Sequence, residues 1–244
     1  MSELVIFDLD NTLIKGQSQK LLLDYVFEKK LIGPVFYFKV LLWFIFYKIG
    51  LVKNPKKIME YSFSFLKDKK VSEFEEIINN FFEEKLKKCI FKEALNLVQK
   101  HKIRGRKILI ISNAVDFIPR RVSHFLGVDH SIGTKLEIVN DKFTGKIKGN
   151  IIYGKNKVSA IRNFIEEHNF SLNNSYGYSD HISDSPLLEI VDHSFAVNPD
   201  KELYKKVKEK NWTVLILSNT KLIKIKHKLC KWLLQKVKDS RRII

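Results

Sequence analysis

Short apolar runs alternate with longer amphipathic segments along most of the chain. Residues 4–7 form an uninterrupted apolar run, and "KILIIS" at 107–112 is a second. Continuous runs rich in β-branched residues are typical of strands buried on both faces of a parallel sheet. Further strand-like runs occupy 175–179, 194–197 and 213–218, and segments of helical periodicity occupy 115–126, 158–168, 186–191 and 201–210. This alternation predicts an α/β fold with a doubly wound parallel sheet.

Residues 15–100 interrupt the alternation, because their pattern is helical throughout and rich in Phe, Leu and Lys. Turn residues break this segment at 33–34, 50 and 54–55. We interpret it as a helical cap inserted between the first two strands. The predicted organisation is a catalytic core at 1–14 and 101–218, a cap at 15–100, and a basic amphipathic helix at 219–244. Within the core, 130–149 is predicted to form a small β excursion that turns at "VND".

Two segments bear on membranes. Residues 33–52 are very apolar, but Lys39 and Lys48 leave a charge-free stretch of only 40–47, far short of the roughly 20 residues of a spanning helix. This segment is either buried within the cap or forms an interfacial helix. The C-terminal residues 221–244 carry seven Lys and two Arg against one Asp, with apolar residues and Trp232 at helical spacing. That helix either contacts an anionic membrane peripherally or docks on the core.

Composition limits the class of protein. Apolar residues make up 45% of the 244 residues, which is enough for a core, and the net charge is +17. Such a charge indicates either an anionic partner or a lysine-rich solvated surface. Cys89 and Cys230 have no metal-ligand spacing, which is typical of a reducing compartment. The amino terminus has no secretory pattern, so we expect a cytoplasmic location, with or without peripheral contact at the inner face of the membrane.

Acidic residues occur where two strands are predicted to end. Asp8 and Asp10 follow the first strand, and Asp180 and Asp184 follow the strand at 175–179. In a parallel sheet these ends share one edge, where ligands bind. Converging carboxylates repel one another unless a cation is present, and hard oxygen ligands suit Mg²⁺. The sequence therefore predicts a magnesium site formed by these four residues.

Four motifs together resemble the haloacid dehalogenase (HAD) superfamily. "DLDNTL" at 8–13 resembles its first motif, and "ISNA" at 111–114 its second. "GKNKVSAIRNF" at 154–164 resembles the third, and "YSDHISDSPLLE" at 178–189 the fourth. The position of the cap resembles the HAD-IB, phosphoserine-phosphatase-like branch. The resemblance implies a Rossmannoid core and a phosphatase.

The resemblance also implies residue roles. Asp8 would be the nucleophile that forms an aspartyl-phosphate, and Asp10 the general acid and base. Lys157 would neutralise phosphate charge, with Lys155 as the rival for this role. Thr12 would position the first loop. Ser112 and the Asn113 backbone N–H would bind phosphate oxygens.

Each role has a plainer alternative. Ser112 could cap a helix, Lys157 could be a solvated surface residue, and Asp184 could be the N-cap of the next helix. Gln17 occupies the position where phosphoserine phosphatases carry a substrate-binding Glu, and it offers no charge to an ammonium group. True phosphoserine activity is therefore less favoured.

The predicted function is Mg²⁺-dependent hydrolysis of a small phosphorylated metabolite. One alternative is a lipid-phosphate phosphatase at the membrane surface, similar to phosphatidylglycerophosphatase. A second is a nucleic-acid-binding protein or a phosphatase of nucleic-acid ends. The charge permits the latter, but no zinc-finger or RRM-type motif supports it.

Overall fold

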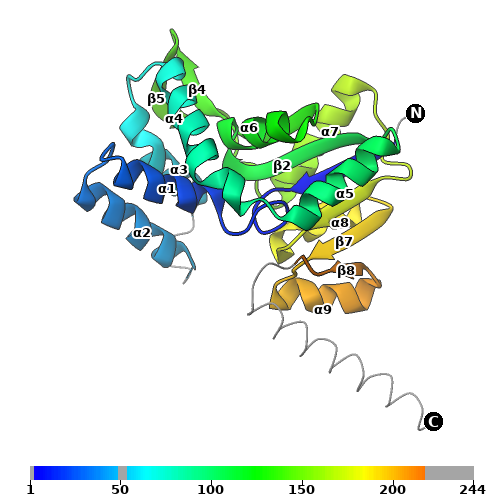
Figure 1. The fold of residues 1–244 in the computed structure, drawn as a ribbon. Coiled ribbons are helices and arrows are strands. Elements are labelled where there is room, and N and C mark those ends of the chain that lie inside the picture. The colour runs from blue at the N-terminus through cyan, green and yellow to red at the C-terminus, as the bar shows by residue number, and fades with distance from the viewer. Residues whose placement is uncertain (1–2, 49–53, 218–244) are drawn as a thin grey trace, which may run out of the picture.

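A computed structural model describes residues 3–48 and 54–217 of the chain (Figure 1). Within these residues a parallel six-stranded sheet has the order β3-β2-β1-β6-β7-β8. Its strands are β1 (Leu4–Asp8), β2 (Lys107–Val115), β3 (His130–Thr134), β6 (Tyr176–Ser179), β7 (His193–Val197) and β8 (Thr213–Leu215). The α/β prediction is thus confirmed. The helix predicted at 219–244 lies outside the described residues.

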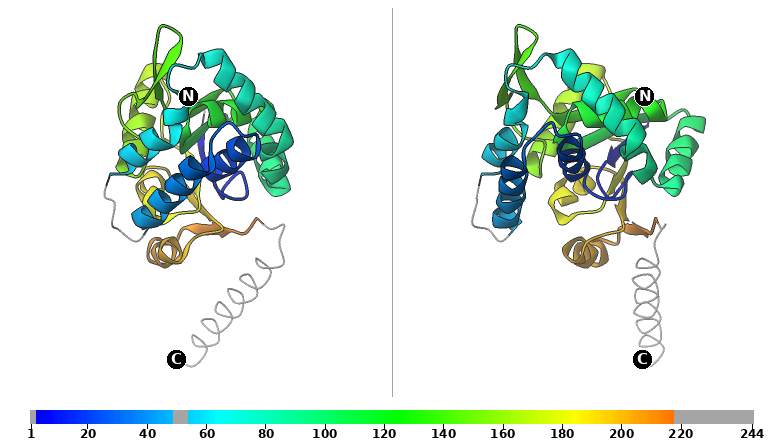
Figure 2. Two further views of the ribbon diagram at one scale, coloured as in Figure 1. Left: turned by 90° about the vertical axis from the view of Figure 1, so that its left-hand side faces the viewer. Right: turned by 60° about the vertical axis from the view of Figure 1, so that its left-hand side comes forward.

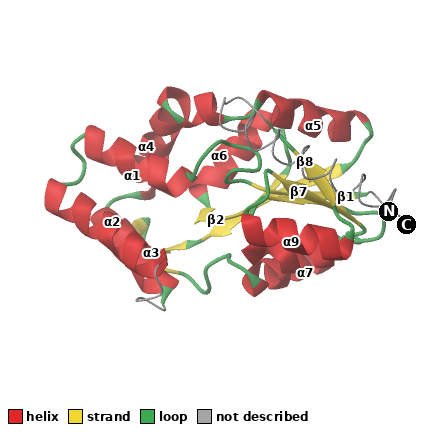
Figure 3. Cartoon of the chain, turned by 90° about the horizontal axis from the view of Figure 1, so that it is seen from below, coloured by secondary structure: helices red, strands yellow, loops and turns green. Residues whose placement is uncertain are grey.

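Helices cover both faces of the sheet, because alternate side chains of each buried strand enter different hydrophobic clusters. Leu4 and Ile6 pack with residues of α7, α8 and α9, whereas Val5 and Phe7 pack with residues of α5 and α6. These helices are α5 (Lys92–Ile103), α6 (Phe117–Leu126), α7 (Lys155–His168), α8 (Ser185–Glu189) and α9 (Lys201–Lys210). Figure 3 shows helices on the two sides of the strands. The sheet is therefore doubly wound, as predicted.

Four helices between β1 and β2 form a separate layer, which we call the cap helices (Figures 1 and 2). They are α1 (Ser18–Glu28), α2 (Pro34–Lys48), α3 (Pro55–Phe63) and α4 (Val71–Glu84), with short 3₁₀ turns at Ser64–Leu66 and Leu86–Cys89. Asn54 caps α3 by accepting from the Lys57 backbone N–H, and Pro55 opens that helix. The helical prediction for this segment is confirmed, although its limits as a domain stay a prediction.

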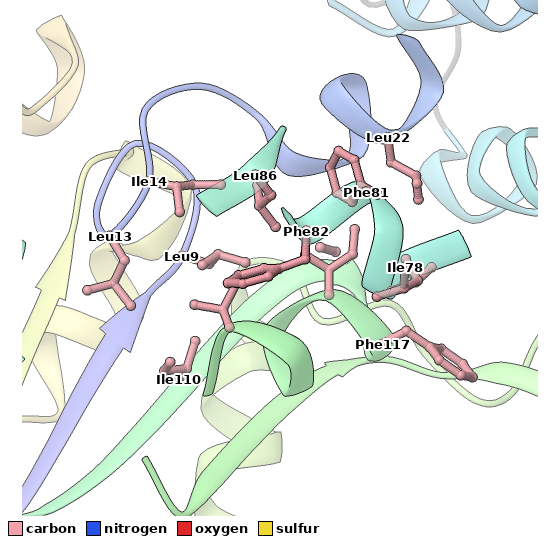
Figure 4. Close-up of a cluster of buried hydrophobic side chains, with 14 of the residues drawn as sticks. Leu9, Leu13, Ile14, Leu22, Ile78, Phe81, Phe82, Leu86, Ile110 and Phe117 are labelled. Atoms are coloured by element: carbon pink, nitrogen blue, oxygen red, sulfur yellow. The ribbon is translucent and has the colours of Figure 1, made fainter. Parts of the chain in front are cut away.

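The cap helices bury the loop that follows β1. Leu9, Leu13 and Ile14 are almost fully buried and lie in one cluster with Phe81 and Phe82 of α4 (Figure 4). Full burial stabilises each such side chain by about 1.5–3 kcal/mol relative to exposure. The backbone adds a bond from the Phe91 N–H to the Leu13 carbonyl (3.0 Å). The loop that carries the first acidic motif is therefore fixed from both sides.

The segment 130–149 differs in part from the prediction. A hairpin forms from β4 (Leu136–Val139) and β5 (Lys142–Ile147), and its turn residues Asn140 and Asp141 both have positive φ. This is the expected "VND" turn. However, β3 pairs with β2 in the main sheet and is not part of the small excursion. The pattern identified a strand there but could not specify its partner.

The hairpin packs on the cap helices. Lys70 and Lys142 form an isolated antiparallel β-bridge, and the Asp68 backbone N–H donates to the Phe143 carbonyl (2.9 Å). The Phe143 ring meets those of Phe74 and Phe117 edge-on. The β excursion thus links the cap helices to the core.

Helix α2 corrects the interpretation that the apolar segment at 33–52 is buried within the cap. Only its inner face is covered, while Val35, Phe38 and Leu42 point outward and are exposed. Because apolar residues occur on every side of α2, its sequence could not indicate which face the cap covers. Over the described residues, no helix has the length and apolarity needed to cross a membrane.

Candidate active site

Sheet pairing brings the two acidic motifs together. β1 lies between β2 and β6, with Asp8 in register with Ile111 and Phe7 in register with Tyr178. Asp8 therefore ends its strand beside Ser112 on one side and close to Asp180 on the other. This is the carboxyl edge at which ligands bind in parallel sheets.

Lys157 joins the two motifs. Helix α7 begins at Lys155, so residue 157 lies in its first turn, and its side chain is only 3% exposed. The ammonium lies 2.5 Å from Oδ1 of Asp8 and 2.7 Å from Oδ2 of Asp184. Burial lowers the pKa of Lys157, but these carboxylates raise it above its ordinary value overall. The surface interpretation of Lys157 is therefore wrong, and Lys155, its rival, is exposed.

Three of the carboxyl groups at the site carry raised pKa values. Burial raises the pKa of Asp8 to about 7, with Lys157 opposing this shift and Asp184 adding to it. Burial also raises the pKa of Asp180 to about 8, reinforced by the charges of Asp8 and Asp184. Burial raises the pKa of Asp10 as well, although its Oδ1 accepts a hydrogen bond from the Ser18 backbone N–H (2.9 Å). Four carboxyl groups thus share one buried ammonium.

This electrostatic imbalance fits a divalent cation. Oδ1 of Asp184 is buried and has no hydrogen-bond partner within the described residues, and carboxylate oxygens are the donors that Mg²⁺ prefers. No group of three or more Asp, Glu, His or Cys side chains in residues 3–48 and 54–217 is already gathered around one point. In charge and donor type, the site fits a cation, but the oxygens are not pre-assembled.

The side chain of Asp184 faces the site and does not cap helix α8. Its Oδ2 accepts from the Ser179 hydroxyl at 2.7 Å as well as from Lys157, and it makes no capping bond. The N-cap alternative therefore describes its position in the chain but not its contacts. Ser179 was missed by sequence reasoning, and its place one residue before Asp180 was the available signal.

Asp200 was also missed. It accepts from the backbone N–H of Ile182 (3.2 Å) and of Leu203 (2.6 Å), and its own N–H donates to the Asp180 carbonyl (2.9 Å). It thereby holds the loop between the two acidic residues of the fourth motif. Its signal was an Asp directly before a predicted helix.

Ser112 and Asn113 lie within β2, so the helix-cap alternative for Ser112 is wrong. The Ser112 hydroxyl is buried and accepts from the Ala114 backbone N–H (3.1 Å). The hydroxyl of Thr12 and the side-chain oxygen of Asn113 are buried without a partner in the described residues. Unsatisfied buried polar atoms of this kind are costly and mark a place where a polar ligand can bind.

Gln17 does not join this cluster. It is exposed, and although it is the N-cap residue of α1, its side chain makes no capping bond.

Sequence reasoning missed a cavity of about 70 Å³ between the cap helices and the core. It is lined by Gln19, Phe44, Pro55, Ile58, Met59, Asn113, Ile151 and Tyr153. Its lining is uncharged and reaches the second motif at Asn113.

Comparison with protein families gives a match to the model for haloacid dehalogenase-like hydrolases over residues 5–189. This chain belongs to that family. The resemblance seen in its four motifs is thereby confirmed. The matched range contains Asp8, Asp10, Asp180 and Asp184, whereas Asp200 lies beyond it.

Curated relatives of this HAD hydrolase bear phosphatase names. A probable phosphatase of Mycobacterium tuberculosis is 32% identical over 148 residues, covering 61% of this chain and 51% of the relative. The chain thus spans about half the length of the first relatives it matches. A histidinol-phosphatase of Neisseria meningitidis is 32% identical over 227 residues, covering 88% of this chain and 99% of the relative.

Solved structures share the fold. A Bordetella pertussis protein of unknown function superposes with a TM-score of 0.82 at 22% identity, covering 89% of this chain and all of its own. A phospho-aspartyl intermediate analogue of phosphoserine phosphatase gives 0.63 at 17% identity, covering 93% and 98%. At these identities the likeness concerns the HAD fold.

Proposed function

We propose that this HAD hydrolase is a Mg²⁺-dependent phosphomonoesterase that works through an aspartyl-phosphate. The observation that carries the proposal is the buried pair of Asp8 and Lys157, 2.5 Å apart at the carboxyl end of β1 with Asp10 two residues on. A carboxylate held beside an ammonium in a buried site can attack phosphorus, while the positive charge of the ammonium offsets the negative charge of the phosphate.

The proposed reaction consists of two displacements at phosphorus. A carboxylate oxygen of Asp8 bonds to phosphorus as the bond between phosphorus and the ester oxygen breaks. Asp10 donates a proton to that leaving oxygen; burial raises its pKa, which favours the protonated form required. Water then attacks phosphorus, and Asp10 takes the proton of that water. The bond between phosphorus and the Asp8 oxygen breaks, so inorganic phosphate leaves and the Asp8 carboxylate re-forms.

The phosphate oxygens require donors besides Lys157. We assign the Ser112 hydroxyl and the Asn113 backbone N–H to them, with Thr12 positioning the first loop. The buried hydroxyl of Thr12 has no partner in the described residues and is free to bond to an added group. Donors fixed within a strand or a packed loop cost little reorganisation when charge develops.

A cation would be held by the carboxylates of Asp8, Asp180 and Asp184 and the backbone carbonyl of Asp10. The buried, unpartnered oxygen of Asp184 supports this assignment. When bound, Mg²⁺ would offset the negative charge that an anionic phosphate brings to an anionic nucleophile.

The substrate class that the site favours is a small phosphorylated metabolite with an uncharged leaving group. The cavity beside Asn113 has no charged side chain in its lining, and Gln17 is exposed. The names of the relatives make histidinol phosphate and phosphoserine necessary members of a substrate panel.

One observation favours a second candidate, a lipid-phosphate phosphatase. Phe44 lines the cavity from helix α2, whose opposite face is apolar and exposed. A phosphate ester with an apolar leaving group could therefore reach the cavity from a lipid surface.

The decisive experiment measures phosphate release from soluble monoesters and from phosphatidylglycerophosphate in vesicles, with Mg²⁺ or with EDTA. Asp8→Asn is expected to lower release by more than about 10³-fold, as does loss of a nucleophile. Asp129→Asn, at an exposed carboxylate far along the chain, is the matched control. Acid quenching with labelled substrate should trap label on the wild type but not on Asp8→Asn. Full activity in Asp8→Asn would refute the mechanism.

A further inference from the structure

Helix α2 presents an apolar stripe to solvent. Val35, Phe38 and Leu42 are 73%, 59% and 48% exposed, and Ile45 continues the series one turn later. These positions are spaced by three and four residues, so their side chains lie along one face of the helix. Leu31, just before the helix, extends the stripe at its amino end. A contiguous apolar surface of this kind marks an interaction site.

The opposite face of α2 is firmly packed, so the exposure of the stripe is not a sign of a loosely docked helix. Val40 is fully buried, the Phe36 and Trp43 rings both stack on Tyr61 of α3, and the Tyr37 ring stacks on Phe27 of α1. The helix lies at the outer margin of the molecule in Figures 1 and 3. The stripe is therefore held outward by a fixed framework.

The surroundings of the stripe are basic. Residues 29–59 contain seven Lys and no Asp or Glu. Lys30, Lys39 and Lys57 are exposed. Asp24, which accepts from the Tyr37 hydroxyl, lies on α1 against the other side of the helix. An apolar stripe in a segment whose charged residues are all lysines is complementary to a surface that is apolar within and anionic outside.

We propose that the stripe of α2 docks this protein on an anionic lipid surface, with the stripe side chains entering the acyl boundary and the lysines contacting headgroups. A second copy of the chain is a poorer occupant, because a two-fold interface would place the same lysines opposite one another. The helix would lie in the interface and would not cross it, since it is too short to span. The proposal does not depend on the reaction that the site performs.

The test is co-sedimentation of the full-length protein with vesicles of phosphatidylcholine alone or with 30% phosphatidylglycerol. We expect the wild type to bind the anionic vesicles preferentially. The combined variant Val35→Gln/Phe38→Gln/Leu42→Gln should bind at least tenfold more weakly. The matched control, Ile103→Gln and Val139→Gln, removes comparably exposed apolar side chains elsewhere and should bind like the wild type. Thermal unfolding of each variant verifies that it is folded.

Three results would overturn the proposal: no binding by the wild type, equal binding to both kinds of vesicle, or undiminished binding by the stripe variant. A concentration-dependent dimer that the stripe variant abolishes would identify a second copy as the occupant instead. Phosphate release from a soluble ester, measured on the same variants, should be unchanged. Failure of docking is thereby separated from failure of the proposed reaction.

Discussion

His101 should make the folded protein less stable in mild acid. The ring is 3% exposed, and it meets the stacked rings of Phe7 and Tyr178 edge-on, beneath the strands that carry the site. Its Nε2 is 2.9 Å from the Tyr178 hydroxyl, and its Nδ1 is 3.1 Å from a guanidinium nitrogen of Arg106. Because Arg can only donate, Nδ1 must accept, so the native ring is the neutral Nε2–H form. Protonation of Nδ1 would place its new N–H against an N–H of the Arg106 guanidinium.

The magnitude follows from linkage. Burial lowers the pKa of His101 from 6.5 to about 4, with the nearby charges of Arg106 and Arg104 adding to the shift and Glu3 opposing it. The native pKa lies below the unfolded one, so the unfolded chain binds the proton first as the pH falls. Stability is therefore lost between pH 6.5 and about pH 4, where the loss levels off. At about 1.36 kcal/mol per pH unit, this amounts to about 3 kcal/mol.

The assay is urea unfolding of the wild type and of His101→Gln between pH 4 and pH 7. The titrations of Asp8 and Asp180 affect both proteins, so the difference between them isolates His101. We expect the wild type to lose about 3 kcal/mol more than the variant over this range. His124→Gln, at an exposed histidine, is the control and should follow the wild type. Equal pH dependence in the wild type and His101→Gln would refute the reasoning.

Three further predictions concern the site and its sheet. Lys157→Met should lower the free energy of unfolding in EDTA by roughly 3–5 kcal/mol, because it leaves buried carboxylates without the Lys157 ammonium. Lys155→Met should change that free energy by no more than about 0.5 kcal/mol. Equal effects of the two substitutions would contradict the assignment of Lys157 to the site. Mg²⁺ at a hundred times its Kd should stabilise the wild type by about 2.7 kcal/mol in thermal unfolding, and a gain of the same size in Asp180→Asn would argue against that ligand. Gly133→Ala should lower the free energy of unfolding in urea more than Gly177→Ala does. The added methyl would lie 2.6 Å from the Asp116 Cα in the first variant and 2.8 Å from the Val191 Cγ2 in the second, and a side chain can move more easily than the backbone. The reverse order would show that the backbone beside β3 relaxes more easily than the side chains packed on β6.

The sheet and the meeting of the acidic motifs could be predicted because parallel strands impose them. A short apolar run rich in β-branched residues is typical of a strand buried on both faces, and the carboxyl ends of parallel strands lie at a common edge. Asp8 and Asp180 could thus be placed together without knowledge of the strand order. The roles assigned to them in the reaction stay predictions.

Other features depended on choices that a local pattern does not contain. The third motif was assigned to Lys157 with Lys155 as its rival, and the start of α7 at residue 155 is what turns Lys157 inward. The strand at 130–134 could be recognised, but its place in the main sheet depends on Gly133, which allows close approach to the Asp116 backbone. The helix at 34–48 has apolar residues on every side, so its exposed face was set by its neighbours.

The hairpin β4–β5 has a consequence for how substrate could enter and leave. Its hydrogen bonds to residues 68–71 mean that the cap helices cannot swing away from the sheet unless the hairpin travels with them or its bonds break. Ile151 and Tyr153 follow the hairpin in the chain and line the cavity opposite the cap helices. The same displacement would therefore move residues on both sides of the cavity. Opening would then be a concerted movement of two segments distant in sequence. The Phe143 amide lies outside the cap helices but donates to the Lys69 carbonyl (3.0 Å), so its hydrogen exchange would report the opening as well as that of an amide within them.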